Sequence, residues 1–130
     1  MPHAISTTVD RPFPEVLEST RSALADQGFG ILTEIDLAAT LREKLDADLP
    51  PQVILGACRP PLALAALDAE PSIGVLLPCN VVVRSVDDGS TVVEAMDPDA
   101  MVAVTGNEAL TDVAADARIR LTSVLDALGR

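Results

Sequence analysis

Two valine-rich runs on either side of Asp87-Asp88-Gly89-Ser90 constrain the fold more than any other feature of the chain. The first run covers residues 73–86 and the second covers residues 91–97. An Asp-Gly pair between two such runs is typical of a tight hairpin turn, because glycine readily adopts the positive φ that the turn requires. The sequence therefore predicts an antiparallel hairpin with Asp88-Gly89 as its loop, and this excludes a purely parallel sheet.

The length of this loop also predicts which residues face each other across the hairpin. Counting outward from a two-residue loop places Asn80 opposite Asp97. Cys79 directly precedes Asn80, so a thiol, an amide and a carboxylate are expected at one end of the hairpin. Pro78 has no N–H to donate to the sheet, and we expect a site to open at this position.

Short strand-like and helix-like segments make up the rest of the chain. Runs rich in Val, Ile, Leu and Thr predict further strands over residues 4–9, 31–35 and 52–58. Apolar residues at helical spacing predict helices over residues 12–27, 37–45, 60–69 and 108–128, with Asp10, Asp36 and Asn107 as N-caps. We expect a single α+β domain of residues 1–130 with two layers, a mainly antiparallel sheet and helices packed mostly on one of its faces.

The composition excludes several classes of protein. A chain of 130 residues is near the usual size of one domain, and 48% of its residues are hydrophobic. Phe13 and Phe29 are the only aromatic residues, so the core must be aliphatic and nucleic-acid bases find no aromatic side chains on which to stack. With 20 acidic and 9 basic side chains, the net charge of −11 repels phosphate backbones and anionic lipids. We therefore expect no binding to nucleic acids or membranes.

We expect the protein to be cytoplasmic. No segment contains the roughly 18 consecutive apolar residues of a transmembrane helix. The N-terminus has no basic region followed by an apolar one, which a secretory signal would require. The 2 cysteines are too few to define a disulfide framework.

Those cysteines, Cys58 and Cys79, are the most reactive groups in the sequence. Cys58 is followed by Arg59 and by a helix that begins at Pro60, and both a positive charge and a helix N-terminus lower a thiol pKa. Cys79 has neither feature nearby in the sequence. If the strand that ends at Cys58 is next to the strand that carries Cys79, the two thiols lie close together. Free cysteine is also often a small buried hydrophobic residue, so structural, reactive, disulfide-bonded and metal-binding thiols all remain open.

Other catalytic and metal-binding patterns are weak. Tetrahedral zinc requires four ligands, whereas the chain offers two cysteines and the single histidine His3 near its terminus. We therefore expect no metal site unless Asp97 or a second subunit completes the set. A Ser-His-Asp triad has only His3 to use, and neither a phosphate-binding loop nor an HExxH motif is present.

Four polar residues are further candidates for ligand contacts. Asn80 and Asp97 lie at predicted strand ends, where such side chains commonly bond to local backbone groups. Glu34 lies inside a strand-like run next to Ile35, and alternation along the strand could direct it to solvent. Lys44, the only lysine, lies on a predicted helix, where it either pairs with a carboxylate in a cleft or belongs to a solvated face.

Several short segments also occur in an order that matches a known family. They are Thr8-Val9-Asp10, the run GFGILTEID at 28–36, EKL at 43–45, ILGAC at 54–58, LLPCNVVV at 76–83 and Asp97-Pro98. Together they resemble the domain-of-unknown-function 302 family over nearly the whole chain, and Leu-Leu-Pro-Cys-Asn is the most specific of them. The resemblance implies a small prokaryotic α+β domain with no established activity. Arg59-Pro60 stands where the family pattern leads us to expect Asn-Pro.

We favour a non-enzymatic binding module for a small ligand or partner. The candidate contact residues are Cys58, Cys79, Asn80, Asp97, Glu34 and Lys44. A homodimer formed through an aliphatic surface is expected, since symmetric dimers are the most common oligomers. The alternatives are a thiol-dependent enzyme or redox protein that uses Cys58 or Cys79, and a metal-binding protein. The sequence identifies no cofactor.

Overall fold

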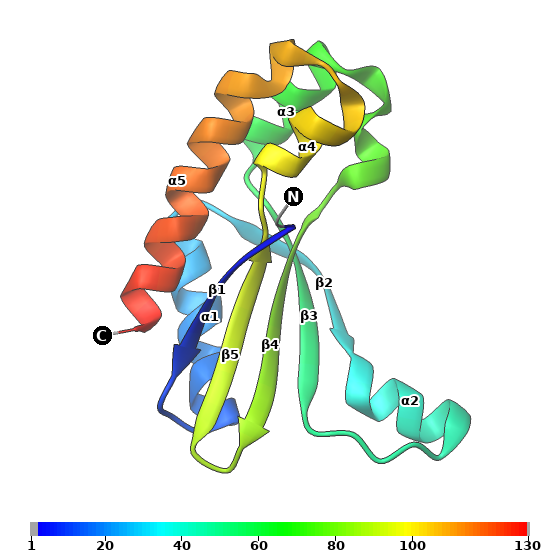
Figure 1. The fold of residues 1–130 in the computed structure, drawn as a ribbon, viewed down its shortest axis with the longest axis vertical. Helices are drawn as coiled ribbons and strands as arrows, with labels where there is room; N and C mark the ends of the chain where they lie inside the picture. The colour runs from blue at the N-terminus through cyan, green and yellow to red at the C-terminus, as the bar shows by residue number, and fades with distance from the viewer. Residues whose placement is uncertain (1–2, 130) are drawn as a thin grey trace.

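The structure, a computed structural model, describes residues 3–129. Its centre is a five-stranded sheet in the order β1-β5-β4-β3-β2, in which all neighbouring strands are antiparallel (Figure 1). The strands are β1 (Ala4–Val9), β2 (Gly30–Asp36), β3 (Gln52–Cys58), β4 (Cys79–Asp87) and β5 (Ser90–Met96). This confirms the predicted α+β class and the antiparallel sheet.

The helices form a layer on one face of the sheet and a cap at one end of it. They are α1 (Phe13–Asp26), α2 (Leu37–Leu45), α3 (Pro60–Ala69), α4 (Asp99–Thr105) and α5 (Thr111–Leu128), with short 3-10 helices η1 (Pro71–Leu76) and η2 (Glu108–Leu110). Helices α1 and α5 pack against the sheet, while α3, η1 and α4 lie together at its upper end in Figure 1. Helix α2 projects from the lower end. None of the helices in residues 3–129 is both long and apolar enough to span a membrane.

Alternation along the central strands determines which side chains enter the main core. We call the side that carries Leu55, Val81 and Val93 the covered face, because each of these residues is 0% exposed and belongs to the cluster that includes residues of α1 and α5. Their neighbours Ile54 and Val82 point to the opposite side, the open face, and are partly exposed. The core is aliphatic, as the composition predicted, with Phe29 as its one fully buried aromatic residue among those described.

A second, smaller core lies at the upper end. Its buried members come from α3, η1, α4, η2 and the first half of α5, and they are Ala66, Ile73, Met101, Leu110 and Ala114. These side chains pack against one another rather than against the centre of the sheet, so the upper end is a separate packing unit. The two cores therefore meet along a junction at the ends of β3 and β4.

The predicted strand over residues 73–86 is wrong in its first half. Residues Pro71–Leu76 form η1, and β4 begins only at Cys79. Glu70 favours the helical start because its carboxylate accepts a hydrogen bond from the backbone N–H of Ser72 at 3.4 Å. Pro78 has no N–H for the sheet, so the ladder cannot extend back through it. An apolar run alone did not distinguish a buried strand from a short helix whose Val75 is 86% exposed.

The predicted register of the hairpin is also wrong beyond its first pair. Asp87 faces Ser90 as a two-residue loop requires, but the pairing then shifts between Ser85 and Asp87. From there on Val81 faces Ala95, so Asn80 does not face Asp97. A β-bulge inserts one unpaired residue into a strand, and this moves every later pair by one position.

Side-chain capping was predicted correctly for α2 and wrongly for α1. The Asp36 carboxylate accepts a hydrogen bond from the backbone N–H of Ala39 at 2.9 Å and so caps α2. Pro12, not Asp10, is the N-cap residue of α1, and no side chain caps that helix. Asn107 accepts a hydrogen bond from the Ala109 N–H at 2.9 Å, but it caps η2, which precedes α5.

Candidate functional site

The two thiols meet at the upper end of the sheet. Strands β3 and β4 are direct neighbours, as the sequence-based hypothesis assumed, and Ala57 faces Cys79 in their register. Cys58, the residue after Ala57, ends β3. Both cysteines line the same cavity and both are free thiols. The tertiary structure thus brings the two candidate thiols together.

This cavity lies at the junction of the two cores and has a volume of about 30 Å³. Its wall is formed by Phe29, Ala57, Cys58, Arg59, Leu62, Ala63, Ala66, Leu77, Cys79, Met101, Val113 and Ala117. Phe29 and Ala57 belong to the main core, whereas Ala66 and Met101 belong to the smaller one. Apart from the two thiols and Arg59, every side chain in the wall is apolar. A space of this size holds about one water molecule or a group of similar volume.

The two thiols differ in exposure, and the more buried one has a raised pKa. Cys79 is 8% exposed, whereas Cys58 is only half-buried. The pKa of the Cys79 thiol is raised from 9.0 to about 11, mainly by burial and to a smaller extent by the neighbouring Cys58. Burial acts this way because a thiolate loses its hydration in an apolar surrounding. Cys79 is therefore a neutral thiol at physiological pH.

Arg59 was not among the candidate ligand-binding residues, yet it forms part of the cavity wall. Its side chain lies across Gly28, where an added Cβ would come within 3.0 Å of the Arg59 Nε. Gly28 also has a φ of 82°, which side-chain-bearing residues rarely adopt. The Arg59 Nε is buried and has no hydrogen-bond partner among the described residues. The available sequence signals were Arg59-Pro60 in place of the expected Asn-Pro and the glycine at position 28.

Asn80 lies on the other side of the sheet from the cavity. Its side chain is exposed on the open face, in a shallow depression that it shares with His3, Val82, Glu94 and Met96. Successive residues of a strand point to opposite faces, and Asn80, unlike the adjacent Cys79, is not part of the cavity wall. The structure therefore separates the predicted thiol–amide pair.

Asp97 is accounted for by contacts within the fold. It is 7% exposed, and its Oδ1 accepts a hydrogen bond from the Asp99 N–H at 3.0 Å and another from Arg118 Nε at 3.3 Å. These contacts connect the end of β5 to the start of α4 and to α5. Bonding of this kind to local backbone is the behaviour that the sequence offered as the alternative to a ligand contact. Asp97 does not form part of the cavity wall.

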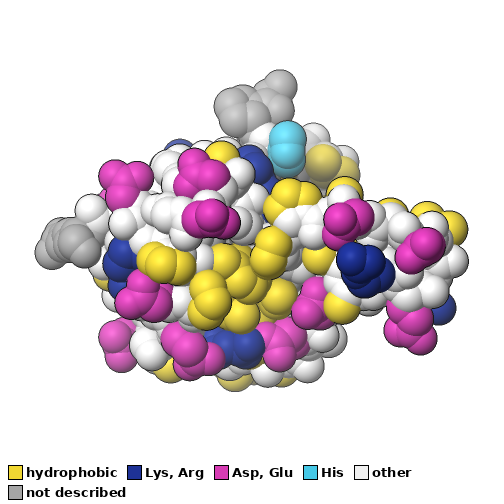
Figure 2. Space-filling model, turned by 90° about the horizontal axis from the view of Figure 1, so that it is seen from below, with side chains coloured by type: hydrophobic (Ala, Val, Ile, Leu, Met, Phe, Trp, Pro, Cys, Tyr) yellow, Lys and Arg dark blue, Asp and Glu magenta, His cyan; other side chains and the backbone are white. Residues whose placement is uncertain are grey.

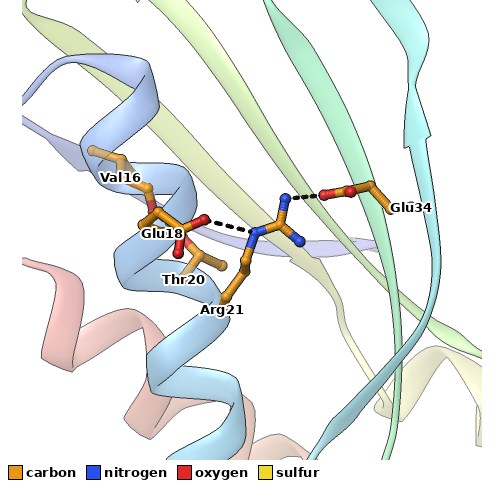
Figure 3. Close-up of polar contacts among 5 residues, drawn as sticks. All are labelled: Val16, Glu18, Thr20, Arg21 and Glu34. Carbon is orange, nitrogen blue, oxygen red and sulfur yellow. Dashed lines mark hydrogen bonds and ion pairs between the residues drawn. The ribbon is translucent and has the colours of Figure 1, made fainter.

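Glu34 connects β2 to α1 through an ion pair with Arg21 (Figure 3). Arg21 also approaches Glu18 on its own helix, with 3.2 Å between its Nε and the Glu18 Oε1. Figure 3 shows the guanidinium of Arg21 held between the two carboxylates. The Glu34 side chain thus points toward α1 while it stays 44% exposed, and its structural partner explains a charged residue in an otherwise apolar run.

Lys44 lies far from the thiols. It is exposed in the last turn of α2, and α2 lies at the lower end of the molecule, opposite the cap formed by α3 and α4. Viewed from below, that end shows a central group of hydrophobic side chains with Asp and Glu side chains around it (Figure 2). The lysine therefore belongs to a solvated face distant from the cavity.

Thr33 and Pro78 pack over Gly56 on the open face, near the upper ends of β3 and β4. Gly56 faces Asn80 across the two strands, and a Cβ on Gly56 would clash with the hydroxyl of Thr33 and lie 2.8 Å from Pro78 Cγ. Thr33 and Pro78 therefore cover the glycine where a larger side chain would push them away. This contact fixes the position of Pro78, the residue that directly precedes Cys79.

Within residues 3–129, no group of three or more His, Cys, Asp and Glu side chains is arranged to hold a metal ion. The cavity itself contributes only two potential ligands, the thiols of Cys58 and Cys79.

Comparisons with known proteins agree with this fold. The family model described as "Domain of unknown function DUF302" matches residues 5–128. The crystal structure of an uncharacterized conserved DUF302 protein from Bacillus stearothermophilus superimposes with a TM-score of 0.90 at 30% sequence identity, and the match covers 98% of this chain and 99% of that one. No curated protein matches the chain. The chain therefore belongs to the DUF302 family.

Proposed function

We propose that this domain is a cytoplasmic, non-enzymatic module that binds a small, mostly apolar ligand in the cavity between α3 and the sheet. The observation that carries this proposal is the cavity wall, which joins residues of two separate cores and contains only three side chains with polar or reactive groups. Binding sites for small molecules are typically concave, mostly apolar and supplied with a few polar groups. The wall has this composition.

The helix that covers the cavity is suited to admitting a ligand. It contributes one large side chain, Leu62, and the small side chains of Ala63 and Ala66 to the wall, and it directs Leu64 and Leu67 outward, where they are 63% and 42% exposed. Few large side chains therefore anchor α3 over the cavity. Regions with little buried apolar area open locally at a lower free-energy cost than the rest of a fold.

A cavity-filling substitution tests this proposal. In Ala63→Leu the new side chain occupies the cavity, so we expect apolar ligands of two to five carbons, chosen from alcohols and carboxylates, to raise the melting temperature of the wild type and not that of the variant. Ala65→Leu, on the same helix but outside the wall, is the matched control and should keep the full ligand-induced shift. Equal shifts in Ala63→Leu and the wild type would place binding elsewhere.

Asp97→Ala provides a second control. Because Asp97 lies outside the cavity wall, we expect this variant to be less stable yet to show the same ligand-induced shift as the wild type. If the ligand-induced shift in melting temperature is lost in Asp97→Ala and kept in Ala63→Leu, the binding site lies at the start of α4 instead.

Self-association accompanies this function in our proposal. Three elements of the upper end each expose a large apolar side chain, namely Leu64 of α3, Val75 of η1 and Val104 of α4, and the last two are 86% and 71% exposed. These side chains support a homodimer through the upper end. Sedimentation equilibrium over a range of protein concentrations tests this, and a monomer at every concentration and salt level contradicts it.

The second candidate function is thiol–disulfide exchange, and the shared cavity of Cys58 and Cys79 favours it. Facing Cα atoms in antiparallel strands are about 5 Å apart and the rise along a strand is about 3.4 Å, so the two cysteine Cα atoms are roughly 6 Å apart, within the range that a disulfide spans. The Cys58 thiolate would attack a small disulfide and release one thiol. The Cys79 thiol would then lose its proton, displace the second thiol and close the Cys58–Cys79 bond, so that two electrons reduce the small disulfide.

Titration of the folded protein with a chromogenic aromatic disulfide tests this candidate. We expect two thiols to be released from the reagent per chain, the first rapidly through Cys58, and only one in Cys79→Ser. If neither cysteine of the wild type reacts until the protein is denatured, thiol exchange is excluded as the function.

A further inference from the structure

We propose that the ligand of the cavity is a short-chain carboxylate whose charged end pairs with Arg59 and whose carbon chain occupies the cavity. This inference rests on the proposed binding function and adds the chemical class of the ligand. Arg59 is the only charged residue in the wall. The wall contains no carboxylate that would compete for the guanidinium.

Among the arginines of residues 3–129, Arg59 differs in that its side chain forms no ion pair or hydrogen bond; Arg11, which also has no ion pair, donates a hydrogen bond to Ser19 Oγ at 3.2 Å. In a chain with 20 acidic and 9 basic side chains, a carboxylate is readily available to most arginines. Arg21, Arg42, Arg84, Arg118 and Arg120 all form ion pairs with Asp or Glu. Among residues 3–129, by contrast, no carboxylate pairs with Arg59, and its buried Nε makes no hydrogen bond.

A buried donor without a partner is unfavourable, and an external anion removes the penalty. Arginine suits this role because its planar guanidinium binds carboxylates through two parallel hydrogen bonds. Gly28 contributes by leaving space for the side chain, since a Cβ there would approach Arg59 Nε to 3.0 Å. The position of Arg59 at the cavity thus depends on a second residue that is distant in the sequence.

The start of α3 supplies no alternative anion site. Pro60 and Pro61 occupy the first turn and have no N–H groups. The next two N–H groups, of Leu62 and Ala63, both donate to the Arg59 carbonyl oxygen at 3.0 Å. Recognition of negative charge at this end of the cavity is therefore left to the Arg59 guanidinium.

The size of the cavity limits the carbon chain. A volume of about 30 Å³ accommodates only a small apolar group. The closed cavity therefore holds about the methyl group of acetate, and α3 must move outward to admit propionate or butyrate. With that movement we expect affinity to rise by about three- to fourfold with each added methylene from acetate to butyrate. Chains longer than butyrate should gain no further affinity.

Calorimetric titration with two matched series tests the inference. The first series is acetate, propionate, butyrate and hexanoate, and the second contains the alcohols of the same chain lengths. We expect the wild type to bind butyrate at least tenfold more tightly than butanol, because a charge-assisted pair is stronger than a neutral contact. In Arg59→Gln this preference should disappear while butanol binding stays unchanged, and Arg59→Lys should keep part of it.

Arg42→Gln is the matched control, since Arg42 is an exposed arginine on α2, at the lower end of the molecule. Far-UV circular dichroism melts establish that each variant is folded. If butanol and butyrate bind the wild type equally well, or if Arg59→Gln keeps the preference for butyrate, the carboxylate inference is overturned and the binding function stands. If no member of either series binds the wild type, the binding function and the inference are both overturned.

Discussion

The two faces of the sheet are built from the same strands and yet have different environments. On the covered face Leu55, Val81 and Val93 are 0% exposed beneath α1 and α5. On the open face their neighbours Ile54 and Val82 are partly exposed. The difference is not one of composition, because valine and isoleucine occur on both faces. It depends on which side the helices cover.

The same comparison explains why the predicted site residues Cys79 and Asn80 lie on different sides of the sheet. Cys79 and Asn80 are adjacent in the sequence, but one lies against the cavity and the other faces outward. A buried thiol gains a raised pKa, whereas an exposed amide keeps its contact with water. Chemistry that needs a dry surrounding is therefore confined to the covered face and its upper end. The open face supplies polar contacts at its surface.

The largest expected difference between the faces comes from two neighbours in β3. Leu55→Ala removes a fully buried side chain and should lower the free energy of unfolding by about 3 kcal/mol. Ile54→Ala, on the open face, should cost about 1 kcal/mol because part of its side chain already contacts water. Urea denaturation followed by circular dichroism measures both. Equal losses would show that the open face is covered in solution.

Cys79 should make stability depend on pH in the alkaline range. Its pKa is raised by burial to about 11 in the folded protein, so the unfolded chain releases the thiol proton at lower pH than the folded one. The stabilisation is complete below pH 9 and is lost as pH rises toward 11, a loss of about 2 to 3 kcal/mol in unfolding free energy. Few other groups titrate there, since the chain has no tyrosine and Lys44 is its only lysine.

Urea denaturation at intervals between pH 8 and pH 11 measures this decrease in the free energy of unfolding. Cys79→Ala should be less stable at every pH but should lack the steep decrease, whereas Asn80→Ala on the open face should retain it. A decrease of the same size in Cys79→Ala would assign the alkaline loss of stability to another group.

At Gly56 the open face is covered by Thr33 and Pro78, so a substitution there should cost more than others on this face. Gly56→Ala puts a methyl group against Thr33 and within 2.8 Å of Pro78 Cγ, and we expect a loss of about 2 kcal/mol. Gly74→Ala is the control, because nothing lies within 4 Å of its added Cβ, and it should change stability little. Thr33→Ala in the Gly56→Ala background should restore part of the loss in a double-mutant cycle.

The smallest expected effect belongs to an ion pair on the open face. Arg84 Nε lies 2.7 Å from Glu94 Oε1, with both side chains partly exposed. Glu94→Gln should cost about 0.5 kcal/mol or less, and the cost should shrink further at high salt. Thermal melts at low and high ionic strength measure it. A loss several times larger would indicate that this face is shielded from solvent.

Much of the secondary structure could be predicted because its signals are local. β-Branched runs identified β1, β2 and β3, and Asp36 identified the start of α2. The run before Pro78 could not be assigned in this way, since apolar residues favour a strand and a short helix alike. The bulge between Ser85 and Asp87 left no signal in the sequence either, and it moved Asn80 out of register with Asp97.

The candidate site was predictable only in part, because some of its features follow from local sequence and others depend on contacts between distant segments. Two cysteines at the ends of β-branched runs suggested a meeting of thiols, and the pairing of β3 with β4 confirms that they line one cavity. Arg59 was considered only as a charge beside Cys58 and not as a ligand contact, because its position depends on contact with Gly28, which belongs to another part of the chain. Glu34 and Asp97 gained their partners, Arg21 and Arg118, in the same long-range manner.

An aliphatic α+β domain with an antiparallel hairpin, an acidic surface and two thiols could be inferred without a structure, because these properties follow from composition and local turn chemistry. Which side of Val81, Val82 and Val83 is dry depends on the packing of the helices, since three valines in succession carry no alternation. The tertiary structure also decided that two small cores meet without filling the space between them. Packing between distant elements creates that cavity, and no local pattern encodes it.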